Sequence, residues 1–238
     1  MFHRLLDHVR AEASGARALE SVRALARFHR VQASPGYDDA ARWLTGQIEA
    51  IGLVPEIETV PGDGRTRCLG HLMPEGWACD RAEATLLDGA GRERLADYGA
   101  EKLSLILRSA PARGRYAIIV IEDGTRDEDY RGVDVRGRVV LTRGAVQSVH
   151  ERAVVERGAA GILYDGRRLV PPVRDAFDDP GALAYTSFWW GEDDPRGWGF
   201  VLSPRAGERL RGRIRSGATL ELDVAIESRA FPIPIPLV

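Results

Sequence analysis

A strand-helix-strand pattern at residues 138–164 is the feature that most constrains the fold of this 238-residue chain. Residues 138–142 form a short apolar run that ends before Gly144, and residues 146–157 then carry apolar side chains on one helical face. Gly158 separates this predicted helix from a second apolar run. Two strands joined through a helix pair in parallel, because the crossover returns the chain to the same edge of the sheet. We therefore expect an α/β fold with one β-α-β crossover.

Helical signals dominate the first fifty residues. Ser34 followed by Pro35 predicts a helix N-cap with proline in the first turn, and Gly52 stands where such a helix would end. Residues 54–60 alternate between apolar and polar side chains, which predicts a strand. We expect residues 1–56 to form a separate helical segment.

The remainder, residues 57–238, is expected to form one β-rich domain whose core lies at residues 115–165. Glycine-rich turns and short apolar pieces, including Leu103–Leu107, are compatible with strands between residues 61 and 114. Further expected elements are strands at residues 116–121 and 200–202, a helix beginning at Ser203-Pro204, and a long strand at residues 219–226. Three prolines in the last seven residues cannot donate hydrogen bonds to a sheet, which predicts an edge segment or a loose tail.

Charge and hydropathy exclude several partners. The chain has 33 Lys+Arg and 35 Asp+Glu, interspersed, with a formal net charge of −2, whereas nucleic-acid-binding domains carry a clustered basic excess. Its apolar runs are far shorter than the ~20 residues that span a bilayer, and the first residues lack the apolar centre of a signal peptide. We therefore expect a cytoplasmic protein with no nucleic-acid partner and no membrane partner.

Metal-binding signatures are incomplete in this sequence. His150 is followed by glutamate, but Val154 occupies the position of the second histidine in H-E-x-x-H. Cys68, His71 and Cys79 fall short of a closed zinc-binding set, and two cysteines do not make a disulfide framework. No acidic run matches a calcium-binding loop. The sequence therefore assigns no metal ligand.

Nucleophile and phosphate-binding motifs are missing as well, since the sequence has no G-x-S-x-G elbow and no G-x-G-x-x-G loop. No catalytic residue is assigned. An aromatic stretch remains, because Tyr185, Phe188, Trp189 and Trp190 bring a large apolar area into a segment rich in Pro, Asp and Gly. These four residues are either core or an exposed recognition surface, and we take them as the candidate contact residues for a substrate or partner.

Several segments resemble a known family. Residues 132–141, Gly-Val-Asp-Val-Arg-Gly-Arg-Val-Val-Leu, resemble a strand of the protease-associated (PA) domain. Residues 153–164, Ala-Val-Val-Glu-Arg-Gly-Ala-Ala-Gly-Ile-Leu-Tyr, resemble its helix-to-strand turn. Residues 29–53 and 200–210 resemble segments that flank the PA insertion in the M28 family of zinc aminopeptidases. The resemblance covers residues 19–228 and implies a PA-like domain of the swivelling β/β/α type.

The resemblance also implies where the chemistry lies. In that family, zinc and its ligands belong to a catalytic domain downstream of the PA insertion, and no position of this chain matches them. The resemblance therefore implies a non-catalytic PA portion of an M28-like metallopeptidase, with no cofactor in this chain. Such a portion influences substrate access or contacts with a protein or peptide partner. It also implies self-association through an apolar face of the N-terminal helices.

Two alternatives stay open. One is a self-contained metal-dependent hydrolase of the aminopeptidase type, with a site assembled from His71, His150 and scattered carboxylates. The other is a free-standing peptide-binding or ligand-binding module that uses the aromatic stretch.

Overall fold

The computed structural model of the chain describes residues 2–89, 91–175 and 178–238 and divides into two compact units. The first unit comprises Met1–Val60 together with Pro234–Val238, and the second comprises Pro61–Ile233. The division falls four residues after the expected boundary at residue 56. The last residues of the chain return to the first unit instead of extending the second.

The first unit consists of three helices and a β-ribbon. The elements are α1 (Phe2–Glu12), α2 (Gly15–Leu25), α3 (Pro35–Ala50), β1 (Glu58–Gly62) and β11 (Ile233–Leu237). Ser34 caps α3 as expected, because its hydroxyl accepts a hydrogen bond from the Tyr37 N–H at 3.3 Å. Strands β1 and β11 form a two-stranded sheet, in which each strand is an edge and the prolines of β11 are tolerated.

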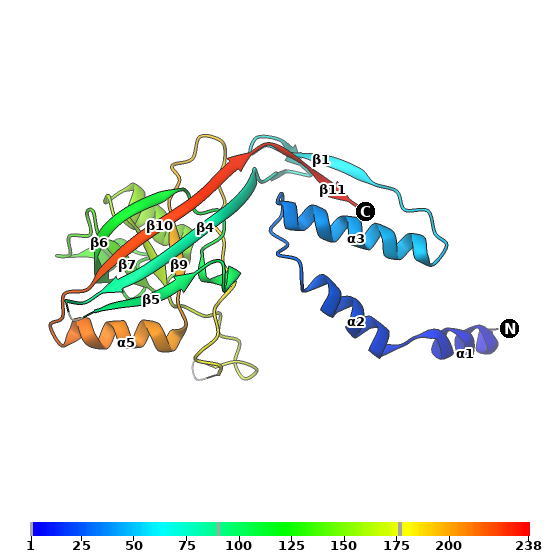
Figure 1. Cartoon of the computed structure of the whole chain (residues 1–238), viewed down its shortest axis with the longest axis horizontal. Coiled ribbons are helices and arrows are strands. Elements are labelled where there is room, and N and C mark those ends of the chain that lie inside the picture. The colour runs from blue at the N-terminus through cyan, green and yellow to red at the C-terminus, as the bar shows by residue number, and fades with distance from the viewer. Residues whose placement is uncertain (1, 90, 176–177) are drawn as a thin grey trace. The chain divides into compact units, whose positions relative to one another are not determined.

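The second unit is built on a seven-stranded sheet with the order β5-β4-β10-β6-β7-β8-β9. Its strands are β4 (Gly76–Leu87), β5 (Arg92–Asp97), β6 (Ala112–Val120), β7 (Val139–Thr142), β8 (Gly161–Tyr164), β9 (Gly199–Val201) and β10 (Glu221–Phe231). Strand β10 runs antiparallel between β4 and β6, whereas β6, β7, β8 and β9 are parallel neighbours. Figure 1 shows β4 and β10 side by side and helix α5 (Pro204–Arg215) next to β5. A short pair, β2 (Arg67–Cys68) with β3 (His71–Leu72), lies outside this sheet.

The predicted crossover connects β7 to β8, and the two strands are parallel, with Val139 opposite Gly161. This confirms the α/β fold. The connection is not a continuous α-helix, however. One α-helical turn, α4 (Val146–Val149), is followed by the π-helical segment η3 (His150–Val155). The Glu156 N–H donates to the Glu151 carbonyl oxygen at 3.0 Å, five residues back, so the wider turn continues to the end of the segment.

The segment Leu103–Leu107 does not form a strand. A 3₁₀ turn, η1 (Lys102–Ser104), precedes an extended piece in which the Ile106 N–H donates to the Gly199 carbonyl oxygen at 2.9 Å. Arg108 then adopts a φ of +62°, which turns the backbone away from a strand conformation. The apolar side chains are buried here, where the segment lies antiparallel beside β9 through an isolated bridge between Leu105 and Phe200.

The core of the second unit lies against the parallel strands. Its buried members include Val140 and Ile162 from the strands, Val149 from α4, and Phe188 from the aromatic stretch. None of the helices formed by the described residues is long and apolar enough to cross a membrane.

Candidate functional site

The aromatic stretch contributes two of its four large rings to the core. Phe188 is fully buried, Trp190 is buried, and their rings stack with centroids 4.7 Å apart. The Trp190 Nε1–H donates to the Arg108 carbonyl oxygen at 2.7 Å, which satisfies its polar group. These two predicted contact residues are therefore covered by the protein's own packing, and they do not form part of an exposed surface.

The other two aromatic residues face outward, because side chains alternate along an extended segment. Tyr185 is 66% exposed and Trp189 is 52% exposed. The Arg108 guanidinium lies over the Trp189 ring, 4.5 Å from its centroid, and the Trp189 N–H donates to Gln147 Oε1 at 3.1 Å. Of the four predicted residues, Tyr185 and Trp189 remain available to a partner.

The two histidines of the hydrolase alternative lie in different environments. His71 is exposed on β3, whereas His150 is buried in the π-helical segment. The His150 ring centroid lies 4.8 Å from that of Trp190 and 5.6 Å from that of Phe188. Burial lowers the pKa of His150. Residues 2–89, 91–175 and 178–238 contain no group of three His, Cys, Asp or Glu side chains that could hold a metal ion.

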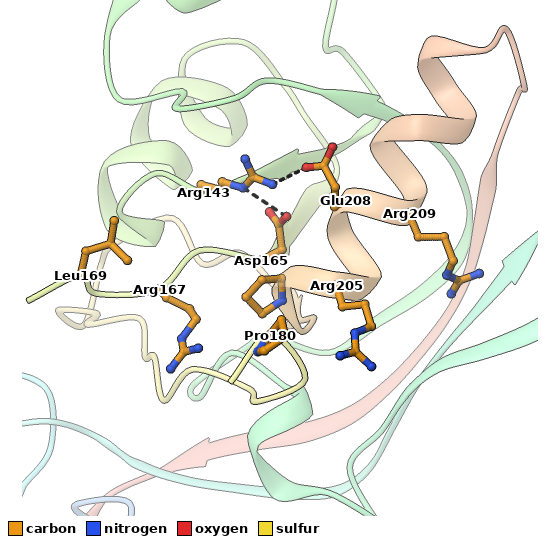
Figure 2. A pocket seen from close by; sticks show the side chains of 9 residues that line it. Arg143, Asp165, Arg167, Leu169, Pro180, Arg205, Glu208 and Arg209 are labelled. Atoms are coloured by element: carbon orange, nitrogen blue, oxygen red, sulfur yellow. Dashed lines mark hydrogen bonds and ion pairs between the residues drawn. The ribbon is translucent and has the colours of Figure 1, made fainter. Parts of the chain in front are cut away.

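A cavity of about 820 Å³ lies where the parallel strands end. Arg143 directly follows β7, Asp165 directly follows β8, and helix α5 begins at Pro204 shortly after β9. Figure 2 shows the side chains of Arg143 and Asp165 among those that line the cavity. In open sheets with parallel strands, ligands bind outside the carboxyl ends of the strands. Position and size therefore make this cavity the candidate binding site of the second unit.

A buried ion pair forms the base of the cavity. The side chains of Arg211 and Asp165 are both fully buried and form a salt bridge. The Arg143 Nε lies 3.5 Å from Asp165 Oδ2, and the Arg211 Nε lies 3.0 Å from Glu122 Oε2. Burial raises the pKa of Asp165, and the guanidinium groups of Arg211 and Arg143 oppose that rise. The acid lies within 4 Å of two cations that favour its charged form.

Arg143 connects this base to helix α5. Its Nη2 donates to Glu208 Oε2 at 2.7 Å (Figure 2). Arg215 Nη2 donates to Glu208 Oε1 at 2.6 Å. These two hydrogen bonds lower the pKa of Glu208. Farther along the helix, Arg209 Nη1 donates to Glu93 Oε2 at 2.7 Å, which joins α5 to β5. Both Arg143 and Arg209 are therefore already paired with carboxylates.

Two further arginines of the cavity form hydrogen bonds with backbone carbonyl oxygens instead of with carboxylates. Arg167 Nη1 donates to the carbonyl oxygens of Asp178 and Asp179, the latter at 2.8 Å. The Arg205 N–H donates to the Pro180 carbonyl oxygen at 2.9 Å, which attaches the loop after β8 to the start of α5. Across the described ranges, neither Arg167 nor Arg205 forms a salt bridge with a carboxylate.

Sequence reasoning did not find this cavity. The available signal was the position of charged residues directly after the predicted strands 138–142 and 161–164, because adjacent parallel strands bring their carboxyl ends together. Arg143 and Asp165 satisfy that pattern. Arg205 and Glu208 do not, since their place beside the cavity depends on how α5 packs.

Comparison with solved structures defines the class of fold. No family sequence model and no curated protein sequence matches this chain. The fold is similar to part of solved peptidase structures. The peptidase M28 precursor from Shewanella amazonensis SB2B superposes with a TM-score of 0.59 at 12% identity, covering 91% of this chain and 48% of that one. The aminopeptidase from Aneurinibacillus sp. strain AM-1 gives 0.53 at 15% identity, covering 91% and 45%. The chain thus spans about half the length of these structures.

Proposed function

We propose that this chain is the PA-type, non-catalytic portion of an M28-like peptidase, and that it binds protein or peptide chains or controls their access to an active site. The observation that carries the proposal is the share of each chain that takes part in the superposition. Two M28-type structures each cover 91% of this chain, yet the match occupies less than half of either one. The PA assignment is supported by residues 132–141 and 153–164, which supply strands β7 and β8 of the crossover.

The exposed aromatic pair is the contact surface in this proposal. Tyr185 and Trp189 present large apolar areas to solvent, and the Arg108 guanidinium under the Trp189 ring holds that indole in place. Exposed aromatic side chains are enriched where proteins bind other chains, because they bury much area at little cost in conformational entropy. The zinc chemistry of M28 peptidases is not assigned to any residue of this chain.

The test has a catalytic arm and a binding arm. The purified chain, supplied with zinc, should not hydrolyse aminoacyl p-nitroanilides. Turnover that a chelator abolishes would instead establish the self-contained hydrolase.

In the binding arm, tryptic casein peptides serve as the probe in a fluorescence titration. Tyr185→Ala and Trp189→Ala should weaken binding by about tenfold each, in line with aromatic hot spots. Val173→Ala, at another exposed apolar position, is the control and should leave binding unchanged.

Unchanged binding after both aromatic substitutions would remove the aromatic pair from the proposal. An absence of any peptide binding would overturn the proposed contact function.

A further inference from the structure

The cavity at the ends of the parallel strands has more positive than negative charge. Its lining includes four arginines but only two carboxylates, Asp165 and Glu208. Asp165 is neutralised by Arg211 beneath it, and Glu208 accepts hydrogen bonds from two arginines. Both carboxylates of the lining are therefore already paired with arginines, and positive charge that a ligand can neutralise is left over.

That positive charge lies on Arg167 and Arg205. Figure 2 shows their side chains on either side of Pro180. Backbone carbonyl oxygens hold one Arg167 nitrogen, Nη1, which leaves its remaining N–H groups for a ligand. The Arg205 N–H is bonded to the Pro180 carbonyl oxygen, and the Arg167 side chain is bonded to the carbonyl oxygens of the two residues that precede Pro180, so both arginines are attached to the same loop. The hydrogen bonds to Arg167 hold its guanidinium before a ligand arrives, which lowers the entropic cost of binding there.

The donors available to a ligand are guanidinium groups and not the N–H groups at the start of helix α5. Phosphate sites at helix N-termini use the free N–H groups of the first turn. Here those groups are occupied, since the Arg205 N–H donates to Pro180, the Ala206 N–H to Ser203 Oγ at 3.2 Å, and the Gly207 N–H to the Ser203 carbonyl oxygen at 2.9 Å. What the cavity offers is guanidinium forks, whose planar geometry matches the two oxygens of a carboxylate as well as those of a phosphate.

The rest of the lining is apolar. Leu169, Pro180 and Pro204 provide a hydrophobic wall beside the arginines. A volume of about 820 Å³ lies within the range of pockets that bind small molecules or a few peptide residues. We propose that this cavity binds a ligand with two carboxylates and an apolar side chain, namely the acidic carboxyl-terminal end of a peptide, through Arg167 and Arg205. The inference does not rest on the proposed contact role of Tyr185 and Trp189.

Three probes show which chemical groups of a ligand the cavity binds. Their binding to the full chain is measured by isothermal titration calorimetry. N-acetyl-Leu-Glu has two carboxylates and an apolar side chain, glutarate has the carboxylates alone, and N-acetyl-Leu-Gln-amide has neither charge. We expect N-acetyl-Leu-Glu to bind and the amide to show no saturable binding. Arg167→Gln and Arg205→Gln should each weaken binding about tenfold, as expected for loss of one charge-assisted pair. Raising the ionic strength should also weaken it, because the cavity is open to solvent.

The matched control is Arg168→Gln, which removes an exposed arginine next to Arg167 that does not line the cavity. Thermal unfolding of every variant establishes that the fold is kept, and Arg205→Lys provides a variant that retains the charge. Glutarate binding as tightly as the peptide would support the two-carboxylate chemistry and identify a free dicarboxylate as the ligand. Equal binding of the acid and the amide, or binding that survives both glutamine substitutions, would overturn the proposal. Loss of binding in Arg168→Gln would overturn it as well.

Discussion

Gly207 sets how closely helix α5 approaches the buried ion pair. A Cβ at this position would collide with the carboxylate of Asp165, which Arg211 holds in place. Gly207→Ala should therefore lower the free energy of unfolding by about 1–3 kcal/mol, the usual cost of overpacking. Gly212→Ala on the same helix is the control, because nothing lies within 4 Å of its added Cβ. It should raise stability by about 0.5–1 kcal/mol, and chemical denaturation of both variants gives the comparison. Equal effects at the two positions would contradict the close approach.

His150 makes stability depend on pH. Burial lowers its pKa in the folded state below the value of about 6.5 expected in the unfolded chain. The unfolded state therefore binds the proton more tightly. The stabilisation is present above about pH 6.5 and is lost as the pH falls below that value. His150 is packed against Phe188 and Trp190 on the aromatic side, and Asp194 is the charged group that opposes the shift.

We expect urea midpoints of the wild type to fall between pH 7 and pH 5 by more than those of His150→Phe. That variant keeps an aromatic ring in the packed site and removes the titration. His71→Gln, at an exposed histidine, is the control and should follow the wild type. A His150→Phe profile as steep as that of the wild type would assign the acid sensitivity to other groups.

At the scale of elements, the sequence predicts helices and strands correctly where the local pattern agrees with the way the element packs. The cap at Ser34, the strands β7 and β8, and the start of α5 at Pro204 all follow from capping chemistry or from short apolar runs. The π-helical segment could not be predicted, because its apolar spacing is the same as that of an α-helix. What distinguishes it is the burial of His150 against the aromatic rings that arrive from residues 188–190. Such contacts are visible only after the chain has folded.

Helices α1 and α2 have apolar residues that the described part of the chain does not bury. Neither helix contains a buried residue, although Leu5 on α1 and Val22 on α2 lie on apolar faces. We expect the protein to self-associate through these faces, since isolated helices of this length are marginal in water without packing. Sedimentation velocity should show a concentration-dependent increase in mass that Val22→Glu reduces. Ser21→Glu adds the same charge on the neighbouring polar position and should have no effect. A wild type that stays monomeric at all concentrations would contradict this expectation.

At the scale of the whole molecule, the candidate site depends on topology more than on motif. Each charged residue of the cavity is visible in the sequence, but only Arg143 and Asp165 follow a pattern, the position directly after a predicted strand. The order β6-β7-β8-β9 brings Arg143 and Asp165 to one end of the sheet, and the antiparallel insertion of β10 could not be inferred from strand patterns alone. The aromatic stretch was prominent in the sequence, yet burial divides it between core and surface. Its composition fixes how much apolar area it has and not which rings point inward.

The two units should also differ in stability. Buried apolar side chains in the first unit are few, and they include Val31, Ala40 and, from the returning strand β11, Ile235, whereas the second unit has a continuous core on its parallel strands. A buried charge without a partner costs several kcal/mol. Ile235→Asp should therefore unfold the first unit and leave the second folded. Hydrogen exchange measured by mass spectrometry should show lost protection in α3 and unchanged protection in β7 and β8. Leu237→Asp, at an exposed position on the same strand, is the control and should leave the protection of both units unchanged. If Ile235→Asp lowered the protection of both units alike, the division into two stability units would be wrong.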